Sequence, residues 1–279
     1  MSAADLENPD FDNADLGQGP YIRLKTLMTR LRTDCPWDSA QNFDTIAPYT
    51  IEEAYEVSEA IAQQDMAALK VELGDLLFQV LFHAIMADEA GAFDLDDVCE
   101  GLITKMVDRH PHVFGDKTSE ADSTAQKQAW EDIKARERAE ASDGNASVLA
   151  DLPLAFPALI RAEKLQKRAA RVGFDWPDIS GVLDKISEEA QEVAQAAATD
   201  DLSDREDEIG DLLFSVTNLA RWLGVDPEKA LRRTNRKFTH RFQAVEATAR
   251  SKGVDLTDMS LAEMEAAWQA AKATESASG

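Results

Sequence analysis

The stretch ELGDLLF at residues 72–78 decides how this chain is organised, because a near-copy, EIGDLLF, occupies residues 208–214. A second pair, EEAYE at residues 52–56 and EEAQE at residues 188–192, repeats at the same offset of 136 residues. Two independent matches in one register indicate two copies of a single unit, duplicated and fused.

Both copies lie in segments whose apolar residues recur at the spacing of an α-helix, and the period-two alternation of strands is hard to find. The clearest helix is expected from about Asp65 to just before Gly91. Its apolar stripe consists of Leu69, Leu73, Leu76, Leu77, Val80, Leu81 and Ala84. Further helices are expected at residues 94–110 (stopped by Pro111), 158–171, 182–198, 206–223 and 227–252, and around Trp268 after a Ser260–Glu263 capping box. The fold class is therefore predicted to be all-α, with tandem duplicated helical bundle units.

Composition separates these units from the rest of the chain. Residues 1–19 are polar and acidic and are interpreted as a disordered tail. Residues 116–150 are rich in charged and small residues and are interpreted as a linker with one helical piece at 130–140. The two helical units are then residues 20–115 and 151–279.

The overall charge and cysteine content exclude several classes of function. The 279 residues carry a formal net charge of -24, so the protein repels polyanions, and nucleic-acid binding is not expected. No secretory signal and no apolar run long enough to span a bilayer are visible, so no membrane partner is expected. Cys35 and Cys99 are too few for a disulfide framework, which favours the cytoplasm.

Each copy carries the pattern E-E-x-x-E on one helix and E-x-x-D on the next. Residues three apart lie on neighbouring parts of one helix face, so antiparallel packing of the two helices would bring four carboxylates together. Such a cluster repels itself unless a hard cation binds it, and oxygen-only ligation suits Mg²⁺ or Mn²⁺. The predicted metal ligands are Glu53, Glu56, Glu72 and Asp75 in the first copy and Glu189, Glu192, Glu208 and Asp211 in the second.

A simpler explanation exists for the first copy, where Thr50 and Glu53 also have the spacing of a capping box. It fails in the second copy, because Ile186 stands three residues before Glu189 and cannot cap a helix. Glu52 and Glu188 are weaker candidates as ligands, since each lies about 100° around the helix from its neighbour.

At these residues the chain resembles the MazG family of nucleoside triphosphate pyrophosphohydrolases, in its two-copy bacterial form. The stretches that carry the resemblance are CPWD at 35–38, TIEEAYE at 50–56, ELGDLLFQV at 72–80, RHPHVFG at 109–115, VGFDW at 172–176, EExxE at 188–192, ExGDLLF at 208–214 and KFxxRF at 237–242. Together they run in one order from about Tyr21 to Lys272.

The resemblance implies a dimeric all-α bundle that binds Mg²⁺ through its E-x-x-E and E-x-x-D carboxylates. It also implies cleavage of a nucleoside triphosphate between the α- and β-phosphates, giving a monophosphate and pyrophosphate. By motif matching, the substrate would contact Lys185, Lys237, Arg241 and Trp268. Where related sequences carry a lysine shortly before E-x-x-D, this chain has Asp204 and Arg205, and Arg205 could substitute one position along.

In such a mechanism Glu188 and Glu189 are the catalytic candidates, with Glu188 preferred as the acceptor of the water's proton. Lys237 and Arg241 are four residues apart and project from one side of a helix, as a triphosphate requires, although a solvated basic face is an alternative. Trp268 could stack on a base or belong to a core. His83 is expected in the core, and His110 and His112 as packing groups around Pro111.

Other functions were considered on the same residues. A di-iron bundle protein wants Glu-x-x-His pairs, and none of the four histidines has a glutamate three residues earlier. A non-catalytic nucleotide-binding regulator remains an alternative, at least for the first copy. So does a narrow-specificity deoxyuridine-nucleotide or phosphoribosyl-ATP hydrolase, because no side chain was identified as reading a base.

The two copies are not expected to be equivalent. Aligning Phe114 with Phe242 places Val113 opposite Arg241 and Pro111 opposite Thr239, so the first copy loses a phosphate-facing cation and the helix that would present it. The second copy is therefore predicted to carry most of the hydrolysis.

Overall fold

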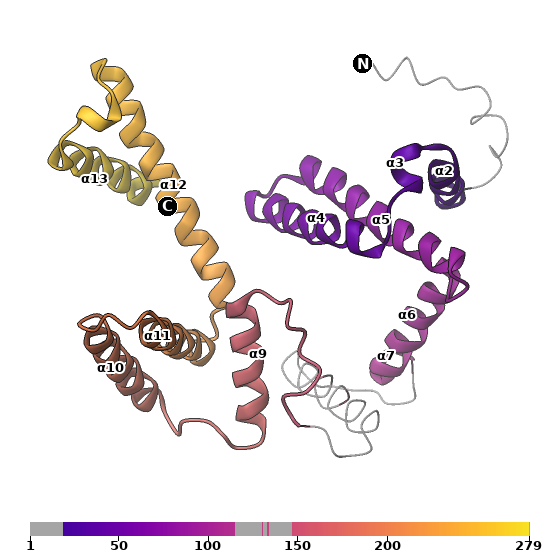
Figure 1. The fold of residues 1–279 in the computed structure, drawn as a ribbon, viewed down its shortest axis with the longest axis horizontal. Coiled ribbons are helices and arrows are strands. Elements are labelled where there is room, and N and C mark those ends of the chain that lie inside the picture. Colours follow the sequence, from indigo (N-terminus) through magenta and orange to yellow (C-terminus); the bar gives the residue numbers. More distant parts are fainter. Residues whose placement is uncertain (1–18, 115–129, 131–132, 134–146, 279) are drawn as a thin grey trace. The chain divides into compact units, whose positions relative to one another are not determined.

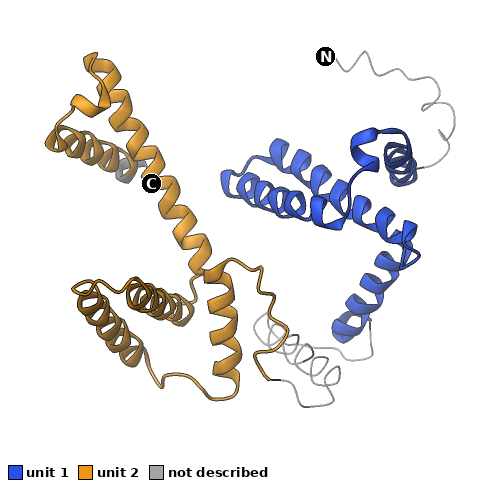
Figure 2. Cartoon of the chain, in the orientation of Figure 1, with its two compact units in different colours: residues 1–133 blue, residues 134–279 orange. Residues whose placement is uncertain are grey.

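The computed structural model describes residues 19–114, 130, 133 and 147–278. The chain divides into two compact units, unit 1 (Met1–Ile133) and unit 2 (Lys134–Gly279), shown in Figure 2. The division falls within the predicted linker, whereas the predicted tail (except its last residue, Gly19) and most of that linker lie outside the described residues. The exact domain boundaries therefore stay a prediction.

Unit 1 is built on an antiparallel pair of long helices, α4 and α5, joined by a two-residue turn (Figure 1). Its helices are α2 (Pro20–Asp34), α3 (Pro36–Ser39), α4 (Phe43–Gln63), α5 (Met66–Glu89), α6 (Leu95–Arg109) and α7 (Pro111–Phe114). α2 and α6 pack on α5 and close a core around Met28, Ile46, Leu81 and Phe82.

Unit 2 repeats the helical pair as α10 and α11, and then extends it. Its helices are α9 (Ala158–Arg171), α10 (Ile179–Ala196), α11 (Leu202–Trp222), α12 (Pro227–Lys252), the short 3₁₀ helix η2 (Leu256–Asp258) and α13 (Leu261–Ser278). α9 packs on α11, in the way that α2 packs on α5. α13 folds back on α12, and Figure 1 shows that α12 runs away from the α10–α11 pair.

Side-chain caps explain where most of these helices begin. The carboxylates of Asp65, Asp178, Asp201 and Asp226 each accept hydrogen bonds from backbone N–H groups in the first turn of α5, α10, α11 and α12. α10 and α11 therefore begin three and four residues earlier than the apolar pattern predicted. α12 begins at Pro227 and ends before Gly253, whose φ of 67° suits glycine, as predicted.

The structure excludes the alternative of a Thr50–Glu53 capping box, and it confirms that Pro111 stops the helix before it. Thr50 does not cap a helix, because α4 begins at Phe43 under a capping box of Asn42 and Thr45. The Thr50 hydroxyl instead lies within α4, 2.9 Å from His83 Nε2, so capping does not account for Glu53. Pro111 does end α6, but it also opens the short helix α7.

The predicted all-α class is confirmed: the part of the chain that the structure describes contains helices and turns and no strand. The Ser260–Glu263 capping box at the start of α13 is also confirmed, with Ser260 N donating to Glu263 Oε2 at 3.0 Å. Among the described helices none has the length and apolar character needed to cross a membrane.

Candidate active site

Three of the predicted carboxylates meet at one point of unit 2. Glu189 on α10 and Glu208 and Asp211 on α11 each offer one oxygen, and these atoms all lie within 4.8 Å of one another. The spacing of Glu208 and Asp211 puts both on the side of α11 that faces α10. This is the arrangement expected from E-x-x-E and E-x-x-D on an antiparallel helical pair.

Glu189 is the most deeply placed member of this cluster. Only 3% of its surface is exposed, and its Oε1 lies 2.6 Å from Lys185 Nζ, one turn earlier on α10. Its other oxygen, Oε2, is buried without a hydrogen-bond partner. A buried carboxylate oxygen left unsatisfied is costly, and a cation at this point would satisfy it.

The carboxyls of Glu208 and Glu192, which lie next to Glu189, are close to other acidic side chains. Partial burial, and after it the charges of Asp204, Glu189 and Asp211, raise the pKa of Glu208 above its usual range. Partial burial and a hydrogen bond with Glu189 likewise raise the pKa of Glu192. Glu192, the fourth predicted ligand, therefore lies beside the cluster. A divalent cation bound here would offset the raised pKa values of Glu192 and Glu208, because it stabilises the charged form of each carboxyl.

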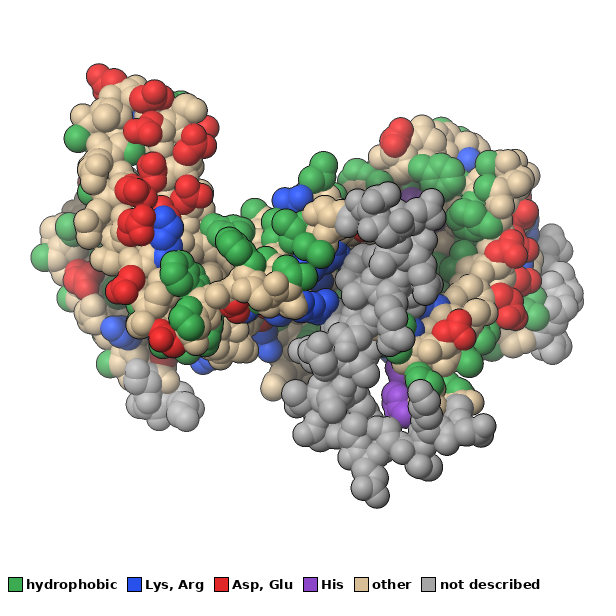
Figure 3. Space-filling view, turned by 90° about the horizontal axis from the view of Figure 1, so that it is seen from below, with side chains coloured by type: hydrophobic (Ala, Val, Ile, Leu, Met, Phe, Trp, Pro, Cys, Tyr) green, Lys and Arg blue, Asp and Glu red, His purple; other side chains and the backbone are tan. Residues whose placement is uncertain are grey.

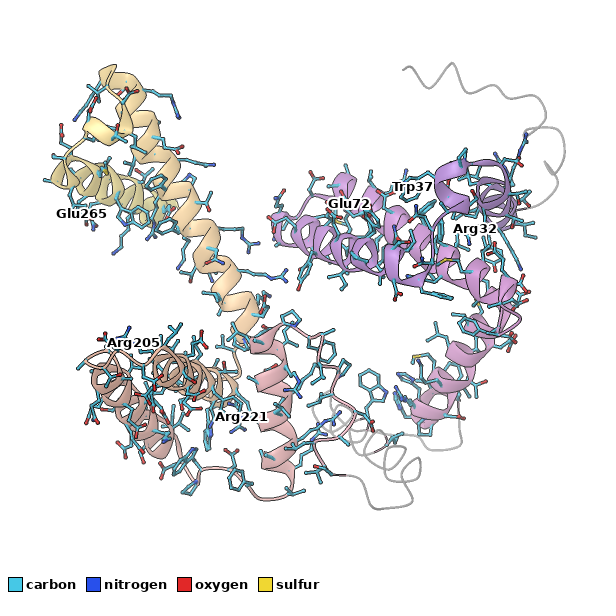
Figure 4. All side chains as sticks on the ribbon, viewed as in Figure 1. Arg32, Trp37, Glu72, Arg205, Arg221 and Glu265 are labelled. Atoms are coloured by element: carbon cyan, nitrogen blue, oxygen red, sulfur yellow. The ribbon has the colours of Figure 1, made fainter. Side chains whose placement is uncertain are left out.

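Unit 1 has a matching cluster of Glu53, Glu56 and Glu72, also within 4.8 Å of one another. Burial and then the charges of Glu56 and Asp75 raise the pKa of Glu53, and burial followed by Glu56 raises the pKa of Glu72. Figure 4 labels Glu72 on α5. Both copies therefore keep a group of oxygen ligands suited to Mg²⁺ or Mn²⁺.

Two other predicted site residues lie at the edge of the unit 2 cluster. Glu188 is exposed on α10, with Oε1 3.0 Å from Lys185 Nζ, so the lysine bridges it to Glu189. Arg205, labelled in Figure 4, donates from Nε to the backbone oxygen of Ala196 at 3.3 Å, at the connection between α10 and α11.

The remaining predicted substrate contacts lie on the α12–α13 hairpin. Arg241 donates to Glu275 Oε2 from Nε and Nη2, at 2.9 and 2.7 Å, and its guanidinium lies 5.6 Å from the centre of the Trp268 ring. Trp268 also contacts Phe238, with ring centres 5.2 Å apart, while Lys237 is exposed. Counting 1.5 Å per residue from Pro227, Lys237 and Arg241 lie about 15 to 21 Å along α12. A single chain does not bring them to the carboxylates.

The sequence also matches the MazG nucleotide pyrophosphohydrolase domain family over residues 41–114 and 179–245, the two segments that hold the two clusters. The chain belongs to the MazG family. It is 49% identical over 258 residues to the nucleoside triphosphate pyrophosphohydrolase of Escherichia coli strain K12, covering 91% of this chain and 97% of that protein. It is also 43% identical over 254 residues to the nucleoside triphosphate pyrophosphohydrolase/pyrophosphatase MazG of Thermotoga maritima, covering 90% and 95%.

Membership of the MazG family confirms the predicted resemblance, the duplicated all-α organisation and the class of enzyme, a hydrolase of the nucleotide pyrophosphohydrolase kind. The roles assigned to individual residues are not tested by these similarities and stay predictions.

Three histidines of unit 1 of this MazG protein, His83, His110 and His112, pack against neighbouring rings. His83 is half-buried, its ring stacks on Phe43 at 5.8 Å, and burial lowers its pKa. His110 ends α6, with Nδ1 2.6 Å from the Met106 carbonyl oxygen, and its ring contacts that of His112.

Sequence reasoning missed the cavity that adjoins the unit 2 carboxylates. It has a volume of about 710 Å³ and is lined by residues of α9, the loop after it, α10 and α11, including Gln166, Trp176, Glu189, Asp211, Asn218 and Arg221. Arg221, near the end of α11, is labelled in Figure 4. The motif VGFDW marks part of this wall, but no spacing rule links residues of α9, α10 and α11, so the rest of the wall could not be predicted.

Proposed function

We propose that unit 2 of this MazG protein hydrolyses nucleoside triphosphates to nucleoside monophosphates and pyrophosphate with the help of Mg²⁺. The observation that carries the proposal is the cluster of Glu189, Glu208 and Asp211, in which a buried carboxylate oxygen lacks a partner. The relatives named above as nucleoside triphosphate pyrophosphohydrolases support the same substrate class.

Glu189, Glu208 and Asp211 would hold the metal, with Glu192 beside them, and Mn²⁺ fits the same oxygen ligands. When bound, such an ion neutralises phosphate oxygens and lowers the pKa of an attacking water. The water adds to the α-phosphorus, the bond to the bridging oxygen breaks, and pyrophosphate leaves.

Glu188 is the proposed acceptor of the water's proton. Its carboxylate is exposed and lies one residue from the buried ligand Glu189, and Lys185 holds both. The shared lysine keeps the Glu188 carboxylate oriented, and its ammonium could move to the phosphates when a metal takes over Glu189. Arg205 is retained as a further phosphate contact.

We also propose that the enzyme is a homodimer, because α12 runs away from the carboxylates of its own chain and takes its cations with it. Lys237, Arg241 and Trp268 lie on a hairpin that runs away from α10 and α11, so the hairpin of a second copy would supply them. Phosphate groups need such charge-assisted contacts beyond the metal.

Apolar side chains support this proposal. Leu73, Leu77 and Val80 on α5 are exposed, and the residues 136 positions later on α11, Ile209, Leu213 and Val216, are exposed as well. Both sets have the spacing of one helix face, and Leu73, Leu77 and Val80 belong to the apolar stripe named in the sequence. Figure 3 shows hydrophobic side chains, in green, at the surface of the face that it draws. A second helical pair would cover such a stripe and complete a four-helix bundle.

For unit 1 we propose a weaker, differently specific or regulatory role. It keeps three clustered carboxylates but has Val113 where Arg241 stands in unit 2.

Cys35 and Cys99 are free thiols, which is compatible with the proposed cytoplasmic location.

The direct test is product analysis with and without added Mg²⁺. The expected result is monophosphate and pyrophosphate from each triphosphate cleaved, with no orthophosphate released first, and loss of turnover on prolonged chelation. Stepwise orthophosphate would indicate attack at the γ-phosphorus, and turnover that survives chelation would contradict the role given to the carboxylates.

The dimer is tested separately by the mass of the particle in solution. Leu213→Lys should lower the mass from that of two chains toward one, since a charge then lies in the covered stripe. The matched control Glu265→Lys on α13 should not. A wild-type monomer at working concentration would contradict the proposal.

A further inference from the structure

We propose that Glu275, in the last part of α13, is a positioning residue that holds the guanidinium of Arg241 in the orientation that receives the phosphates of the substrate. This proposal rests on the proposed function, in which Arg241 contacts those phosphates. Glu275 contacts neither the substrate nor the metal in this scheme. It acts on the reaction through Arg241.

Glu275 binds Arg241 along one edge of the guanidinium. Its Oε2 accepts a hydrogen bond from Nε at 2.9 Å and another from Nη2 at 2.7 Å. These are two of the five N–H donors of an arginine, and the other three, on Nη1 and Nη2, belong to the end of the guanidinium away from Nε. Phosphate oxygens bind to such a planar fork of donors. The ion pair therefore fixes one edge of the guanidinium and leaves the other suited to a phosphate.

Trp268 fixes the plane of the same guanidinium. Cζ of Arg241 lies over the indole, 5.6 Å from the ring centre, and the indole itself packs on Phe238. A guanidinium that only stacks on a ring can still turn within its own plane, and the two hydrogen bonds to Glu275 prevent this rotation. As a result only 18% of the Arg241 side chain is exposed.

The carboxylate of Glu275 is itself held in place. Its Oε1 lies 2.8 Å from Nδ1 of His240, the residue before Arg241 on α12. Hydrogen bonds from Arg241 and, after it, from His240 lower the pKa of Glu275, so this carboxyl is charged at neutral pH. Glu275 is thus a fixed anion between two helices rather than a freely moving surface acid.

Two opposing effects decide what this ion pair does for phosphate binding. A free arginine loses rotamer freedom when it binds a phosphate, and that loss weakens binding. Arg241 loses little, because Glu275 and Trp268 already hold it. The negative charge of Glu275 repels the phosphates, so the proposal requires the fixed orientation to contribute more to binding than this repulsion removes. The two effects change KM in opposite directions, which makes them separable.

The test measures pyrophosphate release from ATP with Mg²⁺ by variants of the full chain. Glu275→Ala should raise KM about three- to tenfold, the size of coupling found between residues in contact, with kcat close to the wild-type value. Glu275→Gln keeps an acceptor oxygen and should restore most of the wild-type KM. The matched control is Glu265→Ala, which also removes a carboxylate from α13. Glu265 accepts from Gln269 of the same helix at 2.6 Å and is labelled in Figure 4, and its loss should leave KM unchanged.

A second comparison shows whether Glu275 acts through Arg241. In the Arg241→Ala background, Glu275→Ala should raise KM no further, because no guanidinium is left to orient. A further rise there would mean that Glu275 acts on the substrate by another route, and would overturn the proposal.

Melting temperatures, measured on the same variants, separate positioning from a purely structural ion pair. A lower melting temperature of Glu275→Ala with an unchanged KM would overturn the proposal, since the pair would then only tie α13 to α12. A lowered KM would also overturn it, because Glu275 would then hold Arg241 back from the substrate. If the wild type releases no pyrophosphate, the proposed function has failed and this proposal with it, whereas normal release by a wild type whose KM does not depend on Glu275 refutes the positioning role alone.

Discussion

Helices α5 and α11 carry the same GDLLF sequence in the same register, yet their inner faces differ beyond this motif. Beyond the shared motif, α5 has Gln79, Phe82 and Ile85, and the residues 136 positions later on α11 are Ser215, Asn218 and Arg221. Phe82 is 2% exposed, within the core of unit 1. Its counterpart Asn218 lines the cavity of unit 2.

The difference shows what the duplication kept and what it changed. Both units keep clustered carboxylates on the face between the paired helices. On the face toward α2 or α9, unit 1 fills the space with apolar side chains, whereas unit 2 leaves a cavity whose wall includes polar side chains. A core stabilises the fold, whereas a cavity can receive a ligand. The same face of the duplicated helical pair therefore serves packing in unit 1 and ligand binding in unit 2.

The largest expected effect tests whether the two clusters are equivalent. Glu189→Ala combined with Asp211→Ala should lower pyrophosphate release at least about 100-fold, since lost metal contacts remove several kcal/mol of charge stabilisation. Glu53→Ala combined with Asp75→Ala should leave most of the activity. The assay uses one panel of triphosphates, with folding checked by circular dichroism.

The opposite pattern, with the unit 1 pair abolishing turnover, would reverse the assignment of the active unit. If each pair of substitutions halves the activity, both units hydrolyse triphosphates, and the lack of a cation at Val113 does not impair unit 1.

The second prediction tests the core of unit 1. Phe82→Asn, which installs the residue of unit 2, should lower the free energy of unfolding by about 3 to 5 kcal/mol, because it leaves a void and an amide in an apolar core. Asn218→Phe, the reciprocal change, should cost far less stability and act mainly on KM. Chemical denaturation followed by circular dichroism measures the first, and a small loss for Phe82→Asn would mean that the two faces are interchangeable.

The third prediction concerns the cations of the α12–α13 hairpin. Lys237→Ala should raise KM about tenfold or more, since a charge-assisted contact contributes roughly 1.5 to 3 kcal/mol. The side chain is exposed, so the melting temperature should not change. Arg241→Ala should show the same rise in KM with some loss of stability, because Arg241 also pairs with Glu275. Unchanged kinetics in both variants would mean that this face is merely solvated.

The smallest expected effect is the pH dependence of the cap of α13, an element by which unit 2 extends beyond the helical pair. Hydrogen bonds from Lys252 and from Ser260 lower the pKa of Glu263 from 4.5 to about 2. A carboxyl with a lowered pKa in the folded state stabilises above its unfolded pKa, and this contribution is lost as the pH falls toward about 2. Glu263→Gln should therefore lower the melting temperature slightly at neutral pH, and the gap from wild type should narrow below pH 4.5. A gap independent of pH would mean that the charge of Glu263 contributes nothing.

Local and repeated signals were enough to predict much of this fold. Asp226, Pro227 and Gly253 mark both ends of α12 through backbone geometry that depends on neighbouring residues alone. The carboxylate cluster was predicted because a period of 136 residues made two weak carboxylate patterns support each other.

The failures have physical reasons. The Thr50–Glu53 spacing allowed a cap as an alternative explanation of Glu53, but Asn42 with Thr45 forms the capping box eight residues earlier, and spacing alone does not decide between two such candidates. Gln166 could not be singled out from the sequence. It lines the cavity and donates to the carbonyl oxygen of Phe214, 48 positions away, which only tertiary packing brings to it.

The reach of α12 has a consequence for mixtures of variants. If one copy supplies Arg241 to the carboxylates of the other, Glu189→Ala and Arg241→Ala damage opposite halves of each shared site. Mixing these two impaired proteins and letting subunits exchange would place an intact Glu189 and an intact Arg241 together in one of the two sites of every hybrid. Random exchange makes half of the dimers hybrid, so about a quarter of the sites would regain activity, a recovery that neither parent shows and that a site confined to one chain forbids.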